Sequence, residues 1–324
     1  MITVYQGIEG DDIAWHLKLL GSDISNIKND VLFVSLNNHY GIQEQNYIPN
    51  AMEKSKDYRT VVLYDLVNNG DWEHPRFTAL ANNFPHPNKY WLTVNQHPIK
   101  LNETQVIPWD FMWNRYKAYY TESTPTGNIH HYAGKEAYQL PDLTITYPKQ
   151  KKLLSLCGRE YGFRKHLYDF VKELDCYYSN RTEGIYLEGT EVIGAFRPIP
   201  NDFYNNSCLS AYVESNCMRP DLIHVTEKTY EPLVKGHFIL PFANPGSVQH
   251  IRTLGFKLPD FIDYSYDTEP DPFVRFTRYL DELKRLLELD LFTLHEQHRD
   301  MFIYNQQCLT AIAYDKRLLS ITNV

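Results

Sequence analysis

Residues 212–245 read YVESNCMRPDLIHVTEKTYEPLVKGHFILPFANP, and this stretch decides the fold of the second half of the chain. One apolar run ends at Val213, a polar segment follows, and a second apolar run begins at His237. Between the runs, the sequence predicts a short helix that begins near Thr226 and stops at Gly236, since glycine is best suited to a left-handed helix end. A strand, a helix and a further strand in this order indicate an α/β sheet.

Polar residues of this stretch are expected to collect at the carboxyl edge of the sheet, where α/β proteins bind nucleotides. They are Glu214, Ser215, Asn216, Thr226, Glu227 and Lys228. At a helix N-terminus, Glu227 can accept from ribose hydroxyls, while Lys228 and the free backbone N–H groups face phosphate. The alternative is that this Glu–Lys pair only complements the helix dipole, as such pairs commonly do. The surrounding residues favour a nucleotide-sugar site.

The same segment resembles the donor-site motif of the α1,3-fucosyltransferase family, in which a Glu-Asn-Ser-like turn precedes Tyr/His-Val-Thr-Glu-Lys. The matching residues are Glu214-Ser215-Asn216 and His224-Val225-Thr226-Glu227-Lys228, followed by a Pro-Leu-x-x-Gly helix end at Pro232 to Gly236. Asn and Ser stand in swapped order relative to the family. The resemblance implies donor contacts from Glu214, Asn216, Thr226, Glu227 and Lys228.

A second match lies upstream, where residues 151–157 read KKLLSLC and predict a buried strand behind a basic lead-in. A turn from Gly158 to Gly162 follows, and then a helix whose apolar residues recur on one face. That face comprises Phe163, Leu167, Phe170, Val171 and Leu174.

Arg164 stands in the first turn of this helix, where a cation opposes the helix dipole at a cost of about 0.3–1 kcal/mol. An arginine at this position without a partner would therefore destabilise the helix. In the fucosyltransferase-like pattern, an arginine of this turn reaches the donor diphosphate, and Arg164 matches it; Arg159 in the preceding loop is the alternative. Either arginine could instead pair with Glu160 or Asp169.

The chain has 324 residues, which exceeds what one ordinary core holds and predicts two domains of about 150 residues. We expect an acceptor-side domain at 1–148, a nucleotide-sugar domain at 149–300, and a helix at 301–324 that could cross back to the first domain. Prolines and a basic run in residues 140–152 place the boundary.

Short apolar runs separated by helical or irregular stretches imply mostly parallel sheets. The predicted strands are 1–5, 31–36, 61–66, 90–94, 105–107, 153–157, 176–178, 208–213 and 237–242. An amphipathic helix carries Phe276, Tyr279, Leu280, Leu283 and Leu287, and helical sequence resumes near His295. Together with the resemblance, this order implies the α/β GT-B architecture, in which two Rossmann-like domains face each other and a helix ends the chain.

Composition excludes several classes of protein. No run approaches the roughly 20 apolar residues of a membrane span, and the first residues lack a signal-peptide pattern, so we expect no membrane insertion and a cytoplasmic protein. The five cysteines are odd in number and show no C-x-x-C spacing, which indicates reduced thiols rather than disulfides or metal ligands. The pairs His130-His131 and His295/His298 lack a third ligand at a compatible spacing, so packing or surface roles are favoured.

The GT-B resemblance implies that donor charge is stabilised by Arg164 and Lys228 as the glycosidic bond breaks. The sequence contains no D-x-D triplet, so a metal is not expected. An inverting reaction needs a base from the first domain. The candidates are Glu9 with Asp11 and Asp12, Asp65, and Asp110. We favour Asp110 because Trp109 and Trp113 would offer stacking surfaces, although helix capping is an alternative role for each acid.

The chain looks like glycosyltransferases of bacteriophages, large viruses and bacteria that build surface polysaccharides. The expected donor is a GDP- or UDP-sugar, and the acceptor is a glycan or a hydroxymethylated DNA base such as 5-hydroxymethylcytosine. A net charge of −8 weighs against strong nonspecific DNA binding, which favours glycan or small-molecule acceptors slightly. A noncatalytic nucleotide-binding scaffold and a GT-B sugar-nucleotide epimerase are the alternatives. The sugar, the nucleobase and the oligomeric state stay open.

Overall fold

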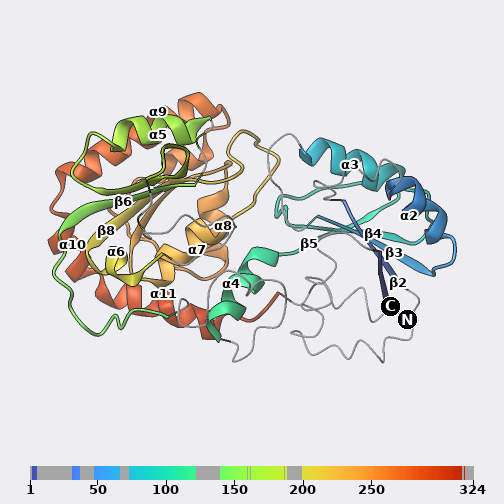
Figure 1. Ribbon diagram of the computed structural model, residues 1–324, viewed down its shortest axis with the longest axis horizontal. Coiled ribbons are helices and arrows are strands. Elements are labelled where there is room, and N and C mark those ends of the chain that lie inside the picture. Colours follow the sequence, from blue (N-terminus) through green and yellow to red (C-terminus); the bar gives the residue numbers. More distant parts are fainter. Residues whose placement is uncertain are drawn as a thin grey trace. The chain divides into compact units, whose positions relative to one another are not determined.

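A computed structural model describes residues 2–5, 31–36, 47–65, 73–121, 139–158, 160, 162–185, 187, 199–315 and 317 (Figure 1). The chain forms two compact units. Unit 1 comprises Met1–Asn114, Thr124–Ile129 and Tyr314–Val324, and unit 2 comprises Arg115–Ser123 and His130–Ala313. The functional boundaries expected at residues 148 and 300 stay a prediction.

Unit 1 holds a five-stranded sheet in which every neighbouring pair of strands is parallel. Its strands are β1 (Ile2–Tyr5), β2 (Val31–Ser35), β3 (Thr60–Asp65), β4 (Lys89–Thr93) and β5 (Gln105–Pro108), and its helices are α2 (Tyr47–Ser55) and α3 (Glu73–Asn83). The residues of β2, β3 and β4 are buried without alternation, as parallel strands covered on both faces require. Ala51 of α2 and Phe77 of α3 join the core that covers one face. Helix α4 (Phe111–Thr121) follows β5.

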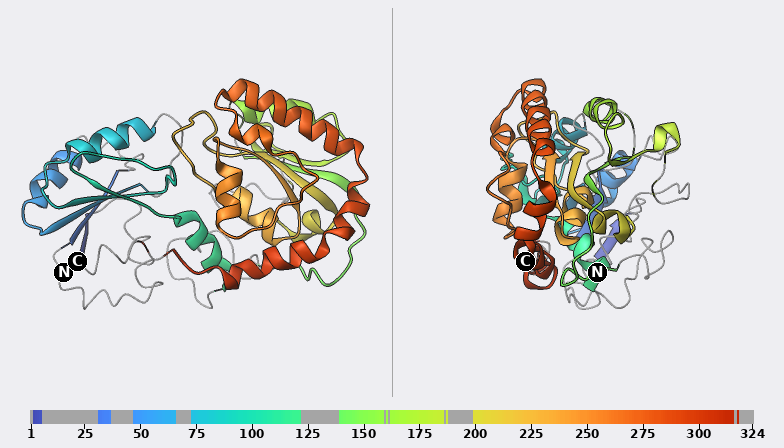
Figure 2. Two further views of the ribbon diagram at one scale, coloured as in Figure 1. Left: turned by 180° about the vertical axis from the view of Figure 1, so that it is seen from behind. Right: turned by 90° about the vertical axis from the view of Figure 1, so that its left-hand side faces the viewer.

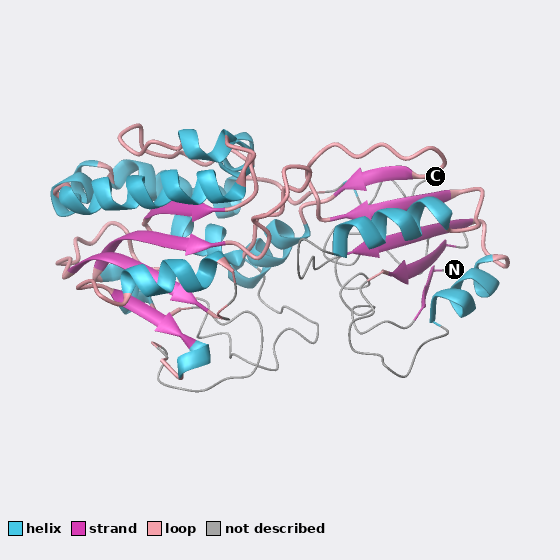
Figure 3. Cartoon of the chain, turned by 90° about the horizontal axis from the view of Figure 1, so that it is seen from above, coloured by secondary structure: helices cyan, strands magenta, loops and turns pink. Residues whose placement is uncertain are grey.

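Unit 2 holds a four-stranded sheet, again with every pair parallel (Figure 3). Its strands are β6 (Lys151–Cys157), β7 (Tyr177–Asn180), β8 (Ser207–Val213) and β9 (Phe238–Phe242). Its helices are α5 (Phe163–Val171), α6 (Asn201–Asn205), α7 (Glu227–Val234), α8 (Ser247–Thr253), α9 (Pro272–Glu288), α10 (Leu291–Gln297) and α11 (Arg299–Ala311), with 3-10 turns η4 (Arg181–Glu183) and η5 (Ser265–Thr268). Figure 2 shows α9, α10 and α11 following one another around this unit.

The two sheets differ in strand order. Unit 1 runs β1-β2-β3-β4-β5 in chain order, whereas unit 2 runs β7-β6-β8-β9. In unit 2 the chain leaves β6 toward β7 and then returns across β6 to form β8. This reversal makes the carboxyl ends of β6 and β8 a topological switch point, where open α/β sheets bind ligands.

The predicted strands are confirmed, with ends that differ by at most two residues. The two parallel α/β sheets, the helix before Gly236 and helical sequence beyond His295 are confirmed as well. Two helix ends differ from expectation: the helix expected at 301–324 is α11, which ends at Ala311, and the helix expected to include Leu174 ends at Val171. Leu174 instead packs against the same core from the turn that follows. Among the helices that the structure describes, none combines the length and apolar character needed to cross a membrane.

Residues 139–150, which precede the first strand of unit 2, are held within that unit by helix α11. Arg299 Nε donates to the carbonyl of Leu143 at 2.9 Å, and Gln306 Nε2 donates to the carbonyl of Pro141 at 3.0 Å. Leu143 thereby lies against Gly236, which ends α7 with a left-handed φ of 80°.

Replacing Gly236 by alanine tests this contact. An added Cβ would lie 2.6 Å from Leu143 Cδ2 and would hold a left-handed backbone, which costs about 1–2 kcal/mol for any residue with a Cβ. Gly184 is the matched control, because its φ is also positive (72°) but nothing lies within 4 Å of an added Cβ. We expect Gly236→Ala to lower the thermal unfolding midpoint more than Gly184→Ala does. Equal shifts would contradict the packing of Leu143 on this turn.

Candidate functional site

Arg164 lies at the switch point, in the first turn of α5. Its side chain is buried, and it donates from Nε to the carbonyl of Val213 at 3.3 Å and from Nη2 to Ser215 Oγ at 3.2 Å. Val213 is the last residue of β8, and Ser215 lies in the loop that follows it. This contact supplies the partner that a cation in the first turn of a helix needs. The sequence also allowed pairing with Glu160 or Asp169, and both carboxylates pair with Lys165, at 2.9 and 3.1 Å.

Lys228 reaches the same hydroxyl from the first turn of α7. Its Nζ lies 3.5 Å from Ser215 Oγ, 3.3 Å from Thr226 Oγ1 and 2.9 Å from Glu227 Oε1. Ser215 Oγ therefore has an arginine nitrogen and a lysine nitrogen within hydrogen-bond range, and Lys228 is also paired with the Glu227 carboxylate. Two cations that converge on one neutral oxygen make a place where an anion is favoured.

Glu227 is half-buried beside Lys228. Burial raises the pKa of the Glu227 carboxyl, but the charge and hydrogen bond of Lys228 outweigh burial, so the pKa lies below the ordinary value. The carboxylate is consequently charged at neutral pH and able to accept hydrogen bonds from a ligand.

Glu214 is fully enclosed, and its carboxyl group holds the start of α7 in place. Oε1 accepts from the backbone N–H of Thr226 at 3.0 Å and from Thr229 Oγ1 at 2.8 Å. Oε2 accepts from Thr226 Oγ1 at 2.6 Å and from the N–H of Ser215 at 3.3 Å. Thr226 in turn caps α7 by accepting from the N–H of Lys228. Glu214 thus ties the end of β8 to the helix start that carries Lys228.

Asn216 and His224 meet inside the loop that joins β8 to α7. Asn216 Nδ2 and His224 Nδ1 lie 3.0 Å apart, and both residues are buried. Their contact closes the loop from within, so the segments Glu214–Asn216 and His224–Lys228 touch each other.

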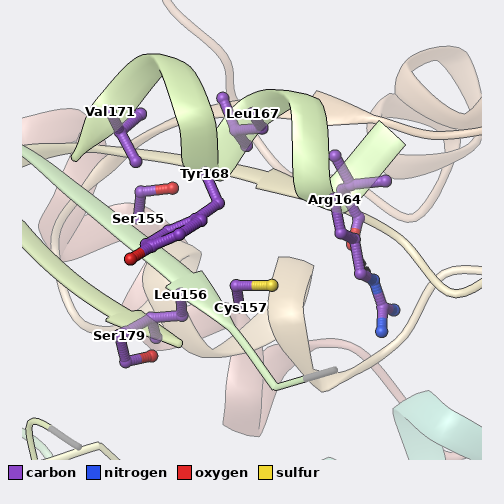
Figure 4. Close-up of a pocket in the computed structure, with 9 residues that line it drawn as sticks. Ser155, Leu156, Cys157, Arg164, Leu167, Tyr168, Val171 and Ser179 are labelled. Carbon is purple, nitrogen blue, oxygen red and sulfur yellow. Dashed lines mark hydrogen bonds between the residues drawn. The ribbon is translucent and has the colours of Figure 1, made fainter. Parts of the chain in front are cut away.

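A small depression opens beside Arg164, between α5 and the ends of β6 and β7 (Figure 4). Ser155, Cys157, Tyr168 and Ser179 line it. Figure 4 shows Tyr168 lying over the strand near Ser155, while Arg164 extends toward the opposite end. Burial raises the pKa of the Cys157 thiol, against the opposing charge of Arg164, so the thiol is neutral.

Asp110 makes two hydrogen bonds in the structure. Its Oδ1 accepts from the N–H of Trp113 at 2.9 Å and so caps α4, and its own N–H donates to Asp315 Oδ2 at 2.8 Å. Trp109 and Trp113 are buried, so the stacking surfaces expected beside Asp110 are taken up by the core. That expectation was wrong because sequence alone did not show which tryptophan faces are covered. The role of Asp110 as a base stays a prediction.

Among the other predicted bases, Asp65 lies within the described part of the chain. Asp65 is buried and accepts from Trp91 Nε1 at 2.8 Å and from Thr93 Oγ1 at 3.1 Å. Glu9, Asp11, Asp12, Arg159 and the pair His130-His131 lie outside the described residues.

The other histidine pair is used in packing. His295 Nε2 and the carbonyl of Gly236 lie 2.7 Å apart, and His298 Nδ1 and the carbonyl of Leu294 lie 2.8 Å apart. Both rings contact the edge of Phe238. Within the described ranges, no three side chains of His, Cys, Asp or Glu come together as a metal site.

Sequence reasoning missed two residues that complete the network around Glu214. Tyr212 OH donates to Thr229 Oγ1 at 2.8 Å, and that hydroxyl donates to Glu214. The signal was the three-residue spacing of Thr226 and Thr229, which places both on one face of α7. Ser215 was recognised as polar, but its central position between the two cations became visible only in the structure.

No protein-family model and no curated protein matches the chain. Among solved structures, the chain is similar to the spinosyn rhamnosyltransferase SpnG complexed with thymidine diphosphate, with a TM-score of 0.37 and 12% sequence identity over 97% of this chain and 77% of that one. The assignment of the site therefore depends on its own geometry.

Exchanging Glu214 for glutamine tests its positioning role. Glutamine keeps the shape but turns an amide N–H₂ group toward donors, and lost hydrogen bonds to a buried acceptor cost about 1–3 kcal/mol. We expect Glu214→Gln to lower the thermal unfolding midpoint by several degrees. Glu227→Gln, half-buried on the same helix start, is the control and should unfold near the wild-type temperature. Equal midpoints for both variants and the wild type would show that Glu214 does not hold α7.

Proposed function

We propose that the chain is a glycosyltransferase of GT-B type, which transfers a sugar from a nucleoside diphosphate sugar to an acceptor hydroxyl. The observation that carries this proposal is the convergence of Arg164 and Lys228 on Ser215 Oγ at the switch point of unit 2. A diphosphate suits this position because it offers several oxygens to both cations at once.

Each residue of the site then has a role. Arg164 and Lys228 bind the diphosphate, and they stabilise the charge that develops on it as the glycosidic bond breaks. Removing one such preorganised donor typically costs about 10²–10³ in kcat. Glu227 accepts hydrogen bonds from the ribose hydroxyls, while Glu214 and Thr226 position the helix start.

The other predicted residues complete the assignment. Asn216 holds the loop through His224, and Arg159 is the alternative ligand of the phosphates. Since two protein cations can balance the leaving diphosphate, the proposed reaction needs no metal, and inversion of the sugar is favoured by the fucosyltransferase-like motif. The general base is assigned to Asp110, with Glu9 as the second candidate.

The donor we propose is a GDP- or UDP-sugar, and the acceptor is a glycan or a hydroxymethylated DNA base such as 5-hydroxymethylcytosine. The second acceptor would make the chain a bacteriophage enzyme that acts in the host cytoplasm. The net charge of −8 favours the glycan. A DNA acceptor would need a locally basic surface.

Nucleotide binding is the first test. We expect calorimetry with GDP, UDP and TDP to give a measurable dissociation constant for at least one of them. Arg164→Ala should weaken that binding about tenfold or more, because it removes charge-assisted hydrogen bonds. Lys165→Ala is the matched control, since this neighbouring cation is bound to Glu160 and Asp169. Equal affinities for both variants would remove Arg164 from the phosphate site and assign the role to Arg159.

Measuring the conversion of a nucleotide sugar distinguishes a transferase from an epimerase and from a noncatalytic scaffold. A transferase releases free nucleoside diphosphate from its donor when the acceptor is present. A sugar-nucleotide epimerase converts the donor with nothing else added, and a noncatalytic scaffold binds the nucleotide without converting it.

Asp110→Asn tests the base. Asparagine is as good an N-cap as aspartate, so the variant should fold and bind the donor like the wild type. It cannot take a proton from the acceptor, and transfer should be lost. Full activity would show that Asp110 only caps α4, and Glu9 would become the leading candidate.

A further inference from the structure

Three exposed apolar side chains, Met218, Phe273 and Val274, belong to the loop after Ser215 and to the helix start that Arg275 ties to this loop. The large hydrophobic residues with exposed side chains in the described part of the chain are Ile145, Met218, Phe273, Val274 and Tyr304. Phe273 is the most exposed of them, at 65%. It stands with Val274 in the first turn of α9, and Met218 lies in the loop between β8 and α7.

The start of α9 is held rigidly. Asp271 caps the helix by accepting from the N–H groups of Phe273 and Val274, both at 2.9 Å, and Pro272 occupies the first helical position. The exposed ring of Phe273 rests edge-on against Phe163, with 5.3 Å between the ring centroids.

Phe163 belongs to a buried aromatic cluster. Its ring centroid lies 4.9 Å from that of Phe242 and 4.7 Å from that of Phe276. Phe273 therefore packs on one side against a buried cluster, while most of its side chain stays exposed.

A buried arginine joins this helix start to the loop that carries Ser215. Arg275 is fully enclosed, lies over the ring of Phe242 at 5.3 Å, and donates to the carbonyl of Cys217 and to that of Glu269, each at 2.5 Å. These hydrogen bonds of Arg275 hold Met218, the residue after Cys217, at the same edge of the unit as Phe273.

The aromatic surface and the anion site are linked through the chain, because Phe163, on which Phe273 rests, directly precedes Arg164. An exposed aromatic ring on a helix start that Arg275 ties to the loop carrying Ser215 is complementary to a molecule that joins a planar ring to a diphosphate. We propose that Phe273 is the stacking platform for the nucleobase of the donor, with Met218 and Val274 at its margin. This inference rests on the proposed function, and it assigns to Phe273 a part in donor selection.

The experiment compares ligands that carry a nucleobase with pyrophosphate, which lacks one. GDP, UDP, TDP and inorganic pyrophosphate are titrated into the full-length wild type, Phe273→Ala and Phe273→Trp. Base–aromatic stacking predicts that Phe273→Ala weakens the preferred nucleoside diphosphate about fivefold or more and leaves pyrophosphate unchanged. Phe273→Trp should retain nucleotide affinity. Ile145→Ala, which removes an exposed apolar side chain of the 139–150 segment, is the control and should bind like the wild type.

Several outcomes would overturn the inference. Unchanged nucleotide affinity in Phe273→Ala would show that the base does not stack there, and an effect confined to the acceptor KM would assign the surface to the acceptor instead. Equal weakening of nucleotide and pyrophosphate would show that Phe273 acts through the packing of α5 and Arg164. In each of these cases the proposed donor site survives. If the wild type binds none of the four ligands, the proposed function itself fails, and the platform with it.

Discussion

The candidate site depends on one buried carboxyl group. Glu214 follows β8, where it is enclosed by protein, and a buried carboxyl group is stable only when hydrogen bonds compensate for lost water. Four donors provide them, and three belong to Thr226 and Thr229 at the start of α7. The hydrogen bonds that satisfy the Glu214 carboxyl group are therefore also the ones that fix the start of α7. The position of Lys228 beside Ser215 follows from them.

The reversal of strand order in unit 2 determines where the second cation lies. Because β6 neighbours β8, the helix after β6 starts beside the end of β8, and Arg164 can reach Val213 and Ser215. A cation in the first turn of a helix opposes the dipole, and local rules are most often broken at functional sites. The carbonyl and the hydroxyl that accept from Arg164 are neutral, whereas Lys228 is paired with the Glu227 carboxylate.

Much of this arrangement is predictable from the sequence, because it depends on short-range patterns. Apolar runs identify the strands, and the interval from Thr226 to Gly236 identifies α7. Contacts between residues that are far apart in the sequence cannot be predicted from such patterns. Asp110 and Asp315 are 205 positions apart, and their bond could not be foreseen. Trp109 and Trp113 were interpreted as stacking surfaces for the same reason, since burial depends on which segments return to cover them. Glu214 was expected to touch the donor, and its depth in the structure and its hydrogen bonds to Thr226 could not be read from the sequence.

The proposed function requires that a nucleoside diphosphate binds where Arg164 and Lys228 converge. A crystal structure of the chain with the nucleoside diphosphate that binds best tests it most directly. We predict diphosphate oxygens at hydrogen-bond distance, about 2.7–3.2 Å, from the side-chain nitrogens of both Arg164 and Lys228. A diphosphate bound away from this pair, with Ser215 Oγ still between the two cations, would contradict the claim.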